Sequence, residues 1–223
     1  MTAAHTIQVG KVTIGLQTAR DWVREYTDAA RNETAADPYA YPAYDQYEQD
    51  TNNPRRLTDA DLLAPVLLNV SVSIRTFYAL GRIRDELEAG LATIDPRRPL
   101  AELNDSEIAE SMQALYGVLD TDPRPHGVRA TVLSKVLHRK APQTLVLHDT
   151  WVRKCYVGAG GPVREAKVRT WVKYMTELTV AIRDDIQNQR SSLQQLEAEV
   201  PAALSHVRLL DILAWKSKGR CAD

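Results

Sequence analysis

Hydrophobic residues follow a strand-like pattern near the start of the chain and a helical pattern after it. Residues 6–16 carry runs of β-branched residues broken at Gly10, which favours a short β-hairpin. After that segment the apolar positions recur at helical spacing, beginning with a stretch over 17–31. The pattern predicts an all-α fold, a compact helical bundle with a short β-hairpin at its N-terminal end.

Polar residues that precede apolar stretches predict where helices begin. Thr58 and Asn104 each have an acid three residues later, which is the arrangement of a capping box, and Ser205 is a third good N-cap. Pro162 follows a glycine-rich joint and is expected in the first turn of a long helix. The helices predicted in this way span about 62–70, 73–91, 104–119, 129–140, 150–156, 162–199 and 205–216.

The stretch before Thr58, residues 33–56, is polar, rich in tyrosine and without periodicity. It predicts an extended loop on the surface, whose tyrosines anchor it or contact a protein partner. No boundary between domains is evident along the chain. Residues 1–223 are therefore predicted to form a single helical domain.

The composition is typical of a soluble globular protein, with 44% hydrophobic and 26% charged residues. No apolar run is long enough to span a bilayer, and the first residues lack the basic-then-apolar pattern of a secretory signal. Two cysteines are too few for a disulfide framework. These features predict a cytoplasmic protein that makes no membrane contact.

Positive charge is concentrated in one segment. Residues 124–173 hold eleven Lys and Arg against two acids, a net charge of +9, whereas residues 1–123 hold eleven bases against twenty acids, a net charge of −9. A basic segment inside an acidic protein indicates a surface that binds polyanions. The polar face of the helix predicted over 129–140 contributes Thr131, Ser134, Lys135 and His138 to this segment.

Within that segment, Gly127-Val128-Arg129-Ala130-Thr131 is followed by a helix through Leu137 and then by Leu145-Val146-Leu147-His148-Asp149-Thr150-Trp151-Val152-Arg153. This order resembles the central part of the helix-hairpin-helix DNA glycosylases, in which a Gly-Val-Gly hairpin and a helix precede an Asp-Thr-His-Val run. The resemblance implies that Gly127 lets the backbone approach a phosphate, and that Asp149 faces a pocket for a flipped base. Outside residues 127–153 the chain resembles a small uncharacterised bacterial family of all-helical proteins.

Three positions depart from the glycosylase pattern. Arg129 replaces the second hairpin glycine, and since its Cβ disfavours positive φ, its side chain would bind the phosphate instead. Thr131 stands where lyase-competent members carry a nucleophilic lysine, and Trp151 where the family often has His. Because a hydroxyl cannot form the Schiff base of strand cleavage, the resemblance implies base removal at most.

The first hypothesis is a nucleic-acid-binding protein, with DNA favoured over RNA, that has a glycosylase-like core and needs no cofactor. Two alternatives remain open. One is a non-catalytic helical module whose basic segment binds an acidic partner or a second copy of the chain. The other is a monofunctional glycosylase with Asp149 as the catalytic carboxylate. The expected nucleic-acid-binding residues are Gly127, Arg129, Thr131, Lys135, His138, Arg139, Lys140, Arg153 and Lys154.

Asp149 also has a simpler interpretation as a plain helix N-cap, which the sequence alone favours. No metal site is expected, because His138, His148, Asp149 and Cys155 match no ligand spacing. The chain carries no Gly-rich phosphate loop, nucleophile elbow or zinc-binding His-Glu-x-x-His motif. The sequence leaves open whether the protein is an enzyme, which base it recognises and its oligomeric state.

Overall fold

The computed structural model describes residues 6–49, 53–200 and 202–223. The chain begins with a two-stranded antiparallel sheet of β1 (Thr6–Val9) and β2 (Val12–Gly15), whose register pairs Ile7 with Ile14. Both isoleucines are buried, so one face of the hairpin belongs to the core. The hairpin predicted over 6–16 is confirmed.

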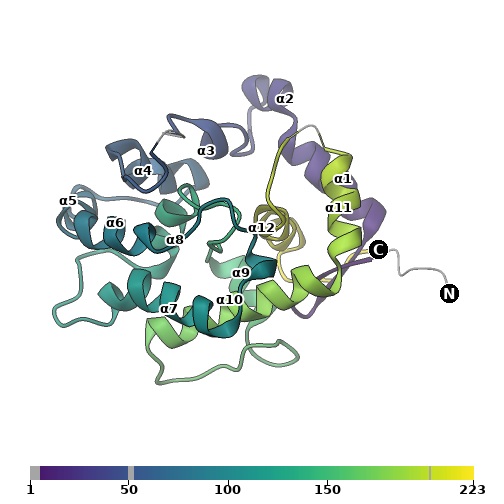
Figure 1. Ribbon diagram of the computed structural model, residues 1–223. Coiled ribbons are helices and arrows are strands. Elements are labelled where there is room, and N and C mark those ends of the chain that lie inside the picture. The colour runs from purple at the N-terminus through teal and green to yellow at the C-terminus, as the bar shows by residue number, and fades with distance from the viewer. Residues whose placement is uncertain (1–5, 50–52, 201) are drawn as a thin grey trace.

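Helices make up most of the rest of the fold. In chain order they are α1 (Leu16–Thr27), α2 (Ala29–Thr34), α3 (Ala43–Gln46), α4 (Asp59–Leu63), η1 (Ala64–Leu68), α5 (Ile74–Arg82), α6 (Arg84–Ala92), η2 (Leu100–Glu102), α7 (Asp105–Tyr116), η3 (Gly117–Leu119), α8 (Ala130–His138), α9 (Thr150–Tyr156), α10 (Trp171–Asn188), α11 (Arg190–Ala198) and α12 (His206–Ser217). Figure 1 shows α7 lying along α10, α1 beside α11, and α12 near the centre.

The central position of α12 follows from its composition. All residues from Val207 to Ala214 are buried, and a helix that is apolar on nearly every side belongs in the interior. It packs against α1, α9, α10, α11 and β1. Two of its buried residues, Arg208 and Asp211, are charged, so the core contains ionic groups that need partners.

The predicted helix caps are confirmed. Thr58 with Asp61 and Asn104 with Glu107 both form capping boxes, in which each side chain bonds the other residue's backbone N–H. The Ser205 hydroxyl accepts from the amide of Arg208 at 3.1 Å and begins α12. These starts depend on residues three positions apart, which explains why sequence alone located them.

The long helix expected from Pro162 begins later, at Trp171, capped by Thr170. Val157 instead pairs with Val163 in an isolated β-bridge, which turns the chain back on itself through the glycine joint. Val168 is 95% exposed in the loop that results. The predicted helix over 73–91 is likewise divided, at Ile83, into α5 and α6.

The stretch 33–56 is only partly the surface loop that its composition predicts, and its residues 50–52 lie outside the described part. It contains the short helix α3, and Tyr44 is fully buried. The Tyr44 hydroxyl donates to the backbone oxygen of Lys135 at 2.7 Å. The tyrosine therefore anchors this stretch to α8.

Two basic residues expected at the surface, Arg139 and Lys140, are buried around Asp61 of α4. The Asp61 carboxylate accepts from Arg139 Nε at 3.1 Å and from Lys140 Nζ at 3.0 Å. Arg139 Nη1 also donates to the Tyr44 carbonyl at 2.8 Å. Burial alone would raise the pKa of Asp61, but the Thr58 amide and these two cations hold it below its usual value. Both cations therefore join α4 to the end of α8, and phosphate binding by them is not supported.

We expect Asp61→Asn to lower the free energy of unfolding by about 3–5 kcal/mol, because two buried cations lose the carboxylate that pairs with both of them. Asp59→Asn, on the same helix and mostly exposed, is the matched control and should change it by less than about 0.5 kcal/mol. Urea denaturation of both variants measures the difference. Equal stabilities would show that the Asp61 cluster contributes nothing.

Candidate functional site

Asp149 performs two tasks with its two carboxylate oxygens. Oδ1 accepts from the amides of Trp151 at 2.8 Å and Val152 at 2.9 Å, which confirms Asp149 as the N-cap of α9. Oδ2 lies 3.7 Å from Nζ of Lys135 on α8. The Asp149 side chain is 20% exposed and lines a pocket, so the cap leaves one oxygen for other contacts.

Lys135 was expected on a solvated helix face, yet its side chain is only 2% exposed. Among the residues that the structure describes, its ammonium makes the ion pair with Asp149 and no hydrogen bond. The stem of the side chain is buried, whereas Nζ is not among the fully buried polar atoms that lack a partner. Lys135 lines the same pocket as Asp149, so its free N–H groups are available to a ligand there.

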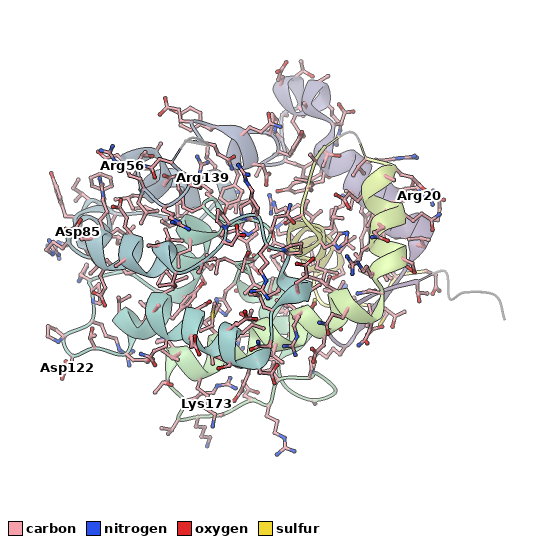
Figure 2. All side chains as sticks on the ribbon, viewed as in Figure 1. Arg20, Arg56, Asp85, Asp122, Arg139 and Lys173 are labelled. Carbon is pink, nitrogen blue, oxygen red and sulfur yellow. The ribbon has the colours of Figure 1, made fainter. Side chains whose placement is uncertain are left out.

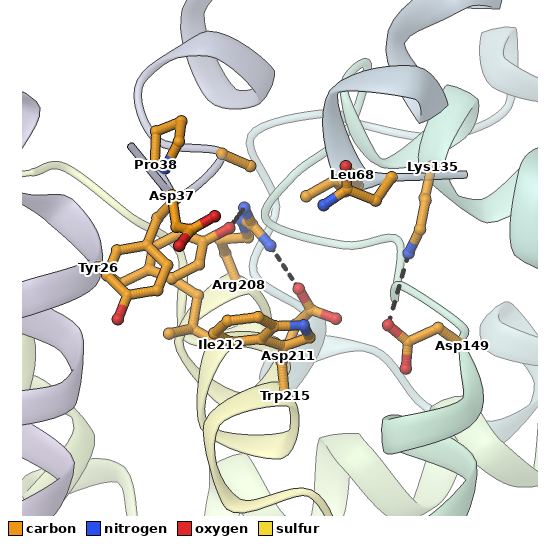
Figure 3. A pocket seen from close by; sticks show the side chains of 13 residues that line it. Tyr26, Asp37, Pro38, Leu68, Lys135, Asp149, Arg208, Asp211, Ile212 and Trp215 are labelled. Carbon is orange, nitrogen blue, oxygen red and sulfur yellow. Dashed lines mark hydrogen bonds and ion pairs between the residues drawn. The ribbon is translucent and has the colours of Figure 1, made fainter. Parts of the chain in front are cut away.

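The pocket that Lys135 and Asp149 share has a volume of about 420 Å³. Figure 3 shows Lys135 and Asp149 on one side and α12 with Tyr26 of α1 on the other. Tyr26 stacks on Tyr39 with ring centroids 5.2 Å apart, and Trp215 meets both rings edge-on. One wall of the pocket is therefore aromatic and the opposite wall is charged.

The inner end of the pocket is formed by an ion pair of α12. Arg208 is buried and donates to Asp45 at 2.8 Å, to the Tyr26 hydroxyl at 3.0 Å and to Oδ2 of Asp211. Burial raises the pKa of the Asp211 carboxyl above its usual value. Oδ1 of Asp211 accepts no hydrogen bond from any other described residue, and Asp211 lines the pocket.

Two further predicted residues, His138 and Thr131, do not form a phosphate-binding face on α8. His138 is buried, and its Nδ1–H donates to the Leu145 carbonyl at 2.6 Å. The Thr131 hydroxyl lies 3.4 Å from Nδ1 of His148, whose Nε2 is 3.0 Å from the Tyr174 hydroxyl. Ser134, Lys135 and His138 on the polar face of α8 are therefore buried, and of these Lys135 lines the pocket.

The expected helix-hairpin-helix element is not shown in the described ranges. Residues 120–129 form the connection before α8, and Gly127 has a positive φ of 71°. A Cβ at Gly127 would lie 2.2 Å from Oγ1 of Thr76, so this glycine permits close packing against α5. Arg129 has an ordinary extended backbone, with φ of −120°, and its side chain is exposed.

Three cations among the predicted binding residues remain exposed: Arg129, Arg153 and Lys154. Lys154 lies over the Trp151 ring, 4.3 Å from its centroid, and Arg153 pairs with Glu165. Figure 2 shows Arg139 within the molecule and Lys173 at its lower edge. The basic segment 124–173 is thus divided between the interior and the surface.

A second and smaller cavity, of about 200 Å³, adjoins the exposed side of α9. Arg153, Lys167 and Arg169 line it with Trp171 and His148. Arg169 is bonded to Glu177, outside the cavity, so part of this positive charge is already neutralised. The larger pocket with Lys135 and Asp149 is therefore the stronger candidate site.

The structure and the site define a mostly helical protein with a lysine–aspartate pair at the edge of a partly aromatic pocket. The chain belongs to the family described as "Family of unknown function (DUF6308)", whose model matches residues 19–218. That range includes every residue of the pocket. The resemblance to an uncharacterised family is therefore consistent with the match, whereas the resemblance to helix-hairpin-helix glycosylases receives no support from it.

Neither the curated proteins nor the solved structures contain a match to this chain. In the described ranges, no group of three or more His, Cys, Asp or Glu side chains is placed to hold a metal ion. No helix there has the length and apolar character needed to cross a membrane.

Of the thirteen residues that line the pocket, the sequence pointed only to Lys135 and Asp149 as site residues. Arg208 and Asp211 carried a signal, since both interrupt the otherwise apolar run of α12 and lie one helical turn apart. Tyr26 and Trp215 carried none, because aromatic residues at helical spacing usually pack in a core. Their place in one pocket depends on α1 lying beside α12.

The Lys135–Asp149 pair can be separated from the cap by a double-mutant cycle. Asn is as good an N-cap as Asp, so Asp149→Asn keeps the cap of α9 and removes only the charge that faces Lys135. We expect Asp149→Asn and Lys135→Met to be coupled by about 1–3 kcal/mol in the free energy of unfolding. Denaturant titration of the two single variants and the double variant measures this coupling, and additive effects would contradict the ion pair.

Acid should destabilise the protein through two buried histidines. Burial lowers the pKa of His138 and His148 to about 4 each, below the value of about 6.5 in an unfolded chain. As the pH falls from 6.5 to 4, the unfolded chain therefore binds protons that the folded protein does not, and stability decreases. Each histidine contributes up to about 1.4 kcal/mol per pH unit.

Asp185 and Asp211 have raised pKa values in the folded protein, so their protonation in acid stabilises the fold and opposes the effect of the histidines. The histidine effect is therefore measured as the difference between the wild type and a histidine variant. His148→Gln should lower by about one the number of protons that the chain takes up on unfolding between pH 6.5 and 4. Identical pH profiles for the wild type and His148→Gln would refute the assignment.

Proposed function

We propose that the protein binds a nucleic-acid strand, DNA in preference to RNA, and takes one unstacked base into the pocket between α8, α9 and α12. The observation that supports this most is the Lys135–Asp149 pair, whose polar atoms open onto a cavity with aromatic walls. A cavity of about 420 Å³ lies within the usual range for small ligands, about 300–1,000 Å³. Trp215 lines the cavity and is 37% exposed, so its ring is available to a heterocyclic ring.

The charges of the pocket favour a base over a phosphate. Three carboxylates, those of Asp37, Asp149 and Asp211, line it against two cations, Lys135 and Arg208. A phosphate would meet an excess of negative charge there, so the base enters and the phosphates stay outside. Arg129, Arg153 and Lys154 are the exposed cations of the predicted set that can contact those phosphates.

A second candidate function is removal of the bound base, and Oδ2 of Asp149 favours it, because this oxygen takes no part in the helix cap. A carboxylate beside the sugar stabilises the positive charge that develops as the bond to the base breaks, or activates water. Strand cleavage is not expected from Thr131, which lies against His148. It would require the amine of Lys135, which lies 3.7 Å from Oδ2 of Asp149.

We expect binding to labelled single-stranded or duplex DNA that weakens steeply between low and physiological salt. Reversing the charge at two exposed sites, Arg129→Glu with Lys154→Glu, should lower the affinity at low salt roughly tenfold and reduce the salt slope by about two. Arg56→Glu is the matched control, because Arg56 is exposed beside α4, away from α9 (Figure 2). Fluorescence anisotropy over a salt series, repeated with RNA, measures these effects.

The outcomes separate the alternatives. Failure of every oligonucleotide to bind at low salt would refute the proposal, and self-association that dissolves with salt would then favour the interaction module. Release of a base that Asp149→Asn abolishes, with strand binding kept, would establish the glycosylase activity. Base release that persists in Asp149→Asn would exclude the role assigned to this carboxylate.

A further inference from the structure

We infer that the pocket selects bases that carry an exocyclic amine beside a ring acceptor, and that Asp211 and Lys135 are the residues that read this edge. The inference rests on the proposed function only in taking the ligand to be a nucleobase. It goes beyond that function by naming the class of base and two residues that determine specificity.

Asp211 supplies an acceptor fixed in position. Its Oδ2 is held by Arg208, which is itself held by Asp45 and the Tyr26 hydroxyl. Its Oδ1 has no hydrogen-bond donor within the described part of the chain, although the Asp211 side chain is only 9% exposed. Figure 3 shows this second oxygen directed toward the side of the pocket that holds Lys135 and Asp149. A fixed, nearly buried acceptor without a donor is completed by a ligand N–H.

Lys135 supplies the donor on the opposite side. Its ammonium has three N–H groups and, in the described structure, a single charged neighbour at 3.7 Å. Oδ2 of Asp149 is a second open acceptor beside it. The pocket therefore presents two acceptors, Asp211 and Asp149, and one donor, Lys135. A complementary base presents more N–H donors than a base whose exocyclic groups are all carbonyls.

This pattern distinguishes the common bases. Adenine and cytosine present an NH₂ group next to a ring nitrogen acceptor, and guanine presents N–H groups next to a carbonyl. Uracil and thymine present two carbonyl oxygens around one N–H, so one of their oxygens would face Asp211 or Asp149. A carbonyl facing a buried carboxylate leaves both acceptors unsatisfied, which disfavours binding.

The test compares matched nucleosides, which carry no phosphate and so do not depend on strand binding. Isothermal titration of the wild-type protein with cytidine against uridine, and with adenosine against purine riboside, measures the preference for the amine. We expect the amine-bearing nucleoside of each pair to bind at least about tenfold more tightly. Equal affinities within a pair, or no binding by any of the four, would overturn the inference.

Asp211→Asn then tests the residue, since an amide keeps the shape and offers both a donor and an acceptor. The preference within each pair should fall to about twofold or less. A melting curve shows whether the variant folds. If it does not, Lys135→Met provides the second test, and it should weaken all four nucleosides because each accepts a hydrogen bond from Lys135. An Asp211→Asn variant that folds and keeps the full preference would overturn the assignment of Asp211.

Strand binding and base selection can fail separately. Salt-sensitive DNA binding without any amine preference would leave the proposed function and remove this inference. An amine preference for nucleosides without strand binding would leave this inference and remove the proposed function.

Discussion

Burial of cationic side chains is the constraint on which the rest of this structure depends. Lys135, Arg139, Lys140 and Arg208 all lie in the interior, where an unpaired charge is strongly unfavourable. Each is brought against a carboxylate from another part of the chain or another turn of its helix. These pairings join α8 to α4 and α9, and α12 to α3. Three of the eleven Lys and Arg residues of the segment 124–173 are therefore used to hold the fold together.

The buried pairs differ in how completely they are satisfied, and this difference separates structural groups from candidate functional ones. The Asp61 carboxylate accepts from Arg139, Lys140 and the Thr58 amide, so both of its oxygens are occupied. The Lys135 ammonium has one carboxylate at 3.7 Å and no hydrogen bond within the described residues. Groups that are buried yet incompletely bonded are where a ligand gains most by binding, since it supplies the missing partners.

Local signals in the sequence were enough to place many of the elements. The caps at Thr58, Asn104, Asp149 and Ser205 are all confirmed, because each bond joins residues two or three positions apart. Asp149 was also expected in a pocket, and it lines one, although the helix-hairpin-helix element that suggested this is not shown. The start of α10 was misplaced because a proline in a helix-like position could not reveal the β-bridge between Val157 and Val163.

The sequence by itself determined the helical character of the chain, the start of its capped helices, its N-terminal hairpin and the concentration of positive charge in one segment. All of these depend on neighbours within a few positions. Only the tertiary structure decided which cations face water, because a long basic side chain is buried or exposed according to the carboxylates that other elements bring to it. The tertiary structure also decided the pocket. Its aromatic wall and its open Asp211 oxygen exist only where α1 and α12 meet the Lys135–Asp149 pair.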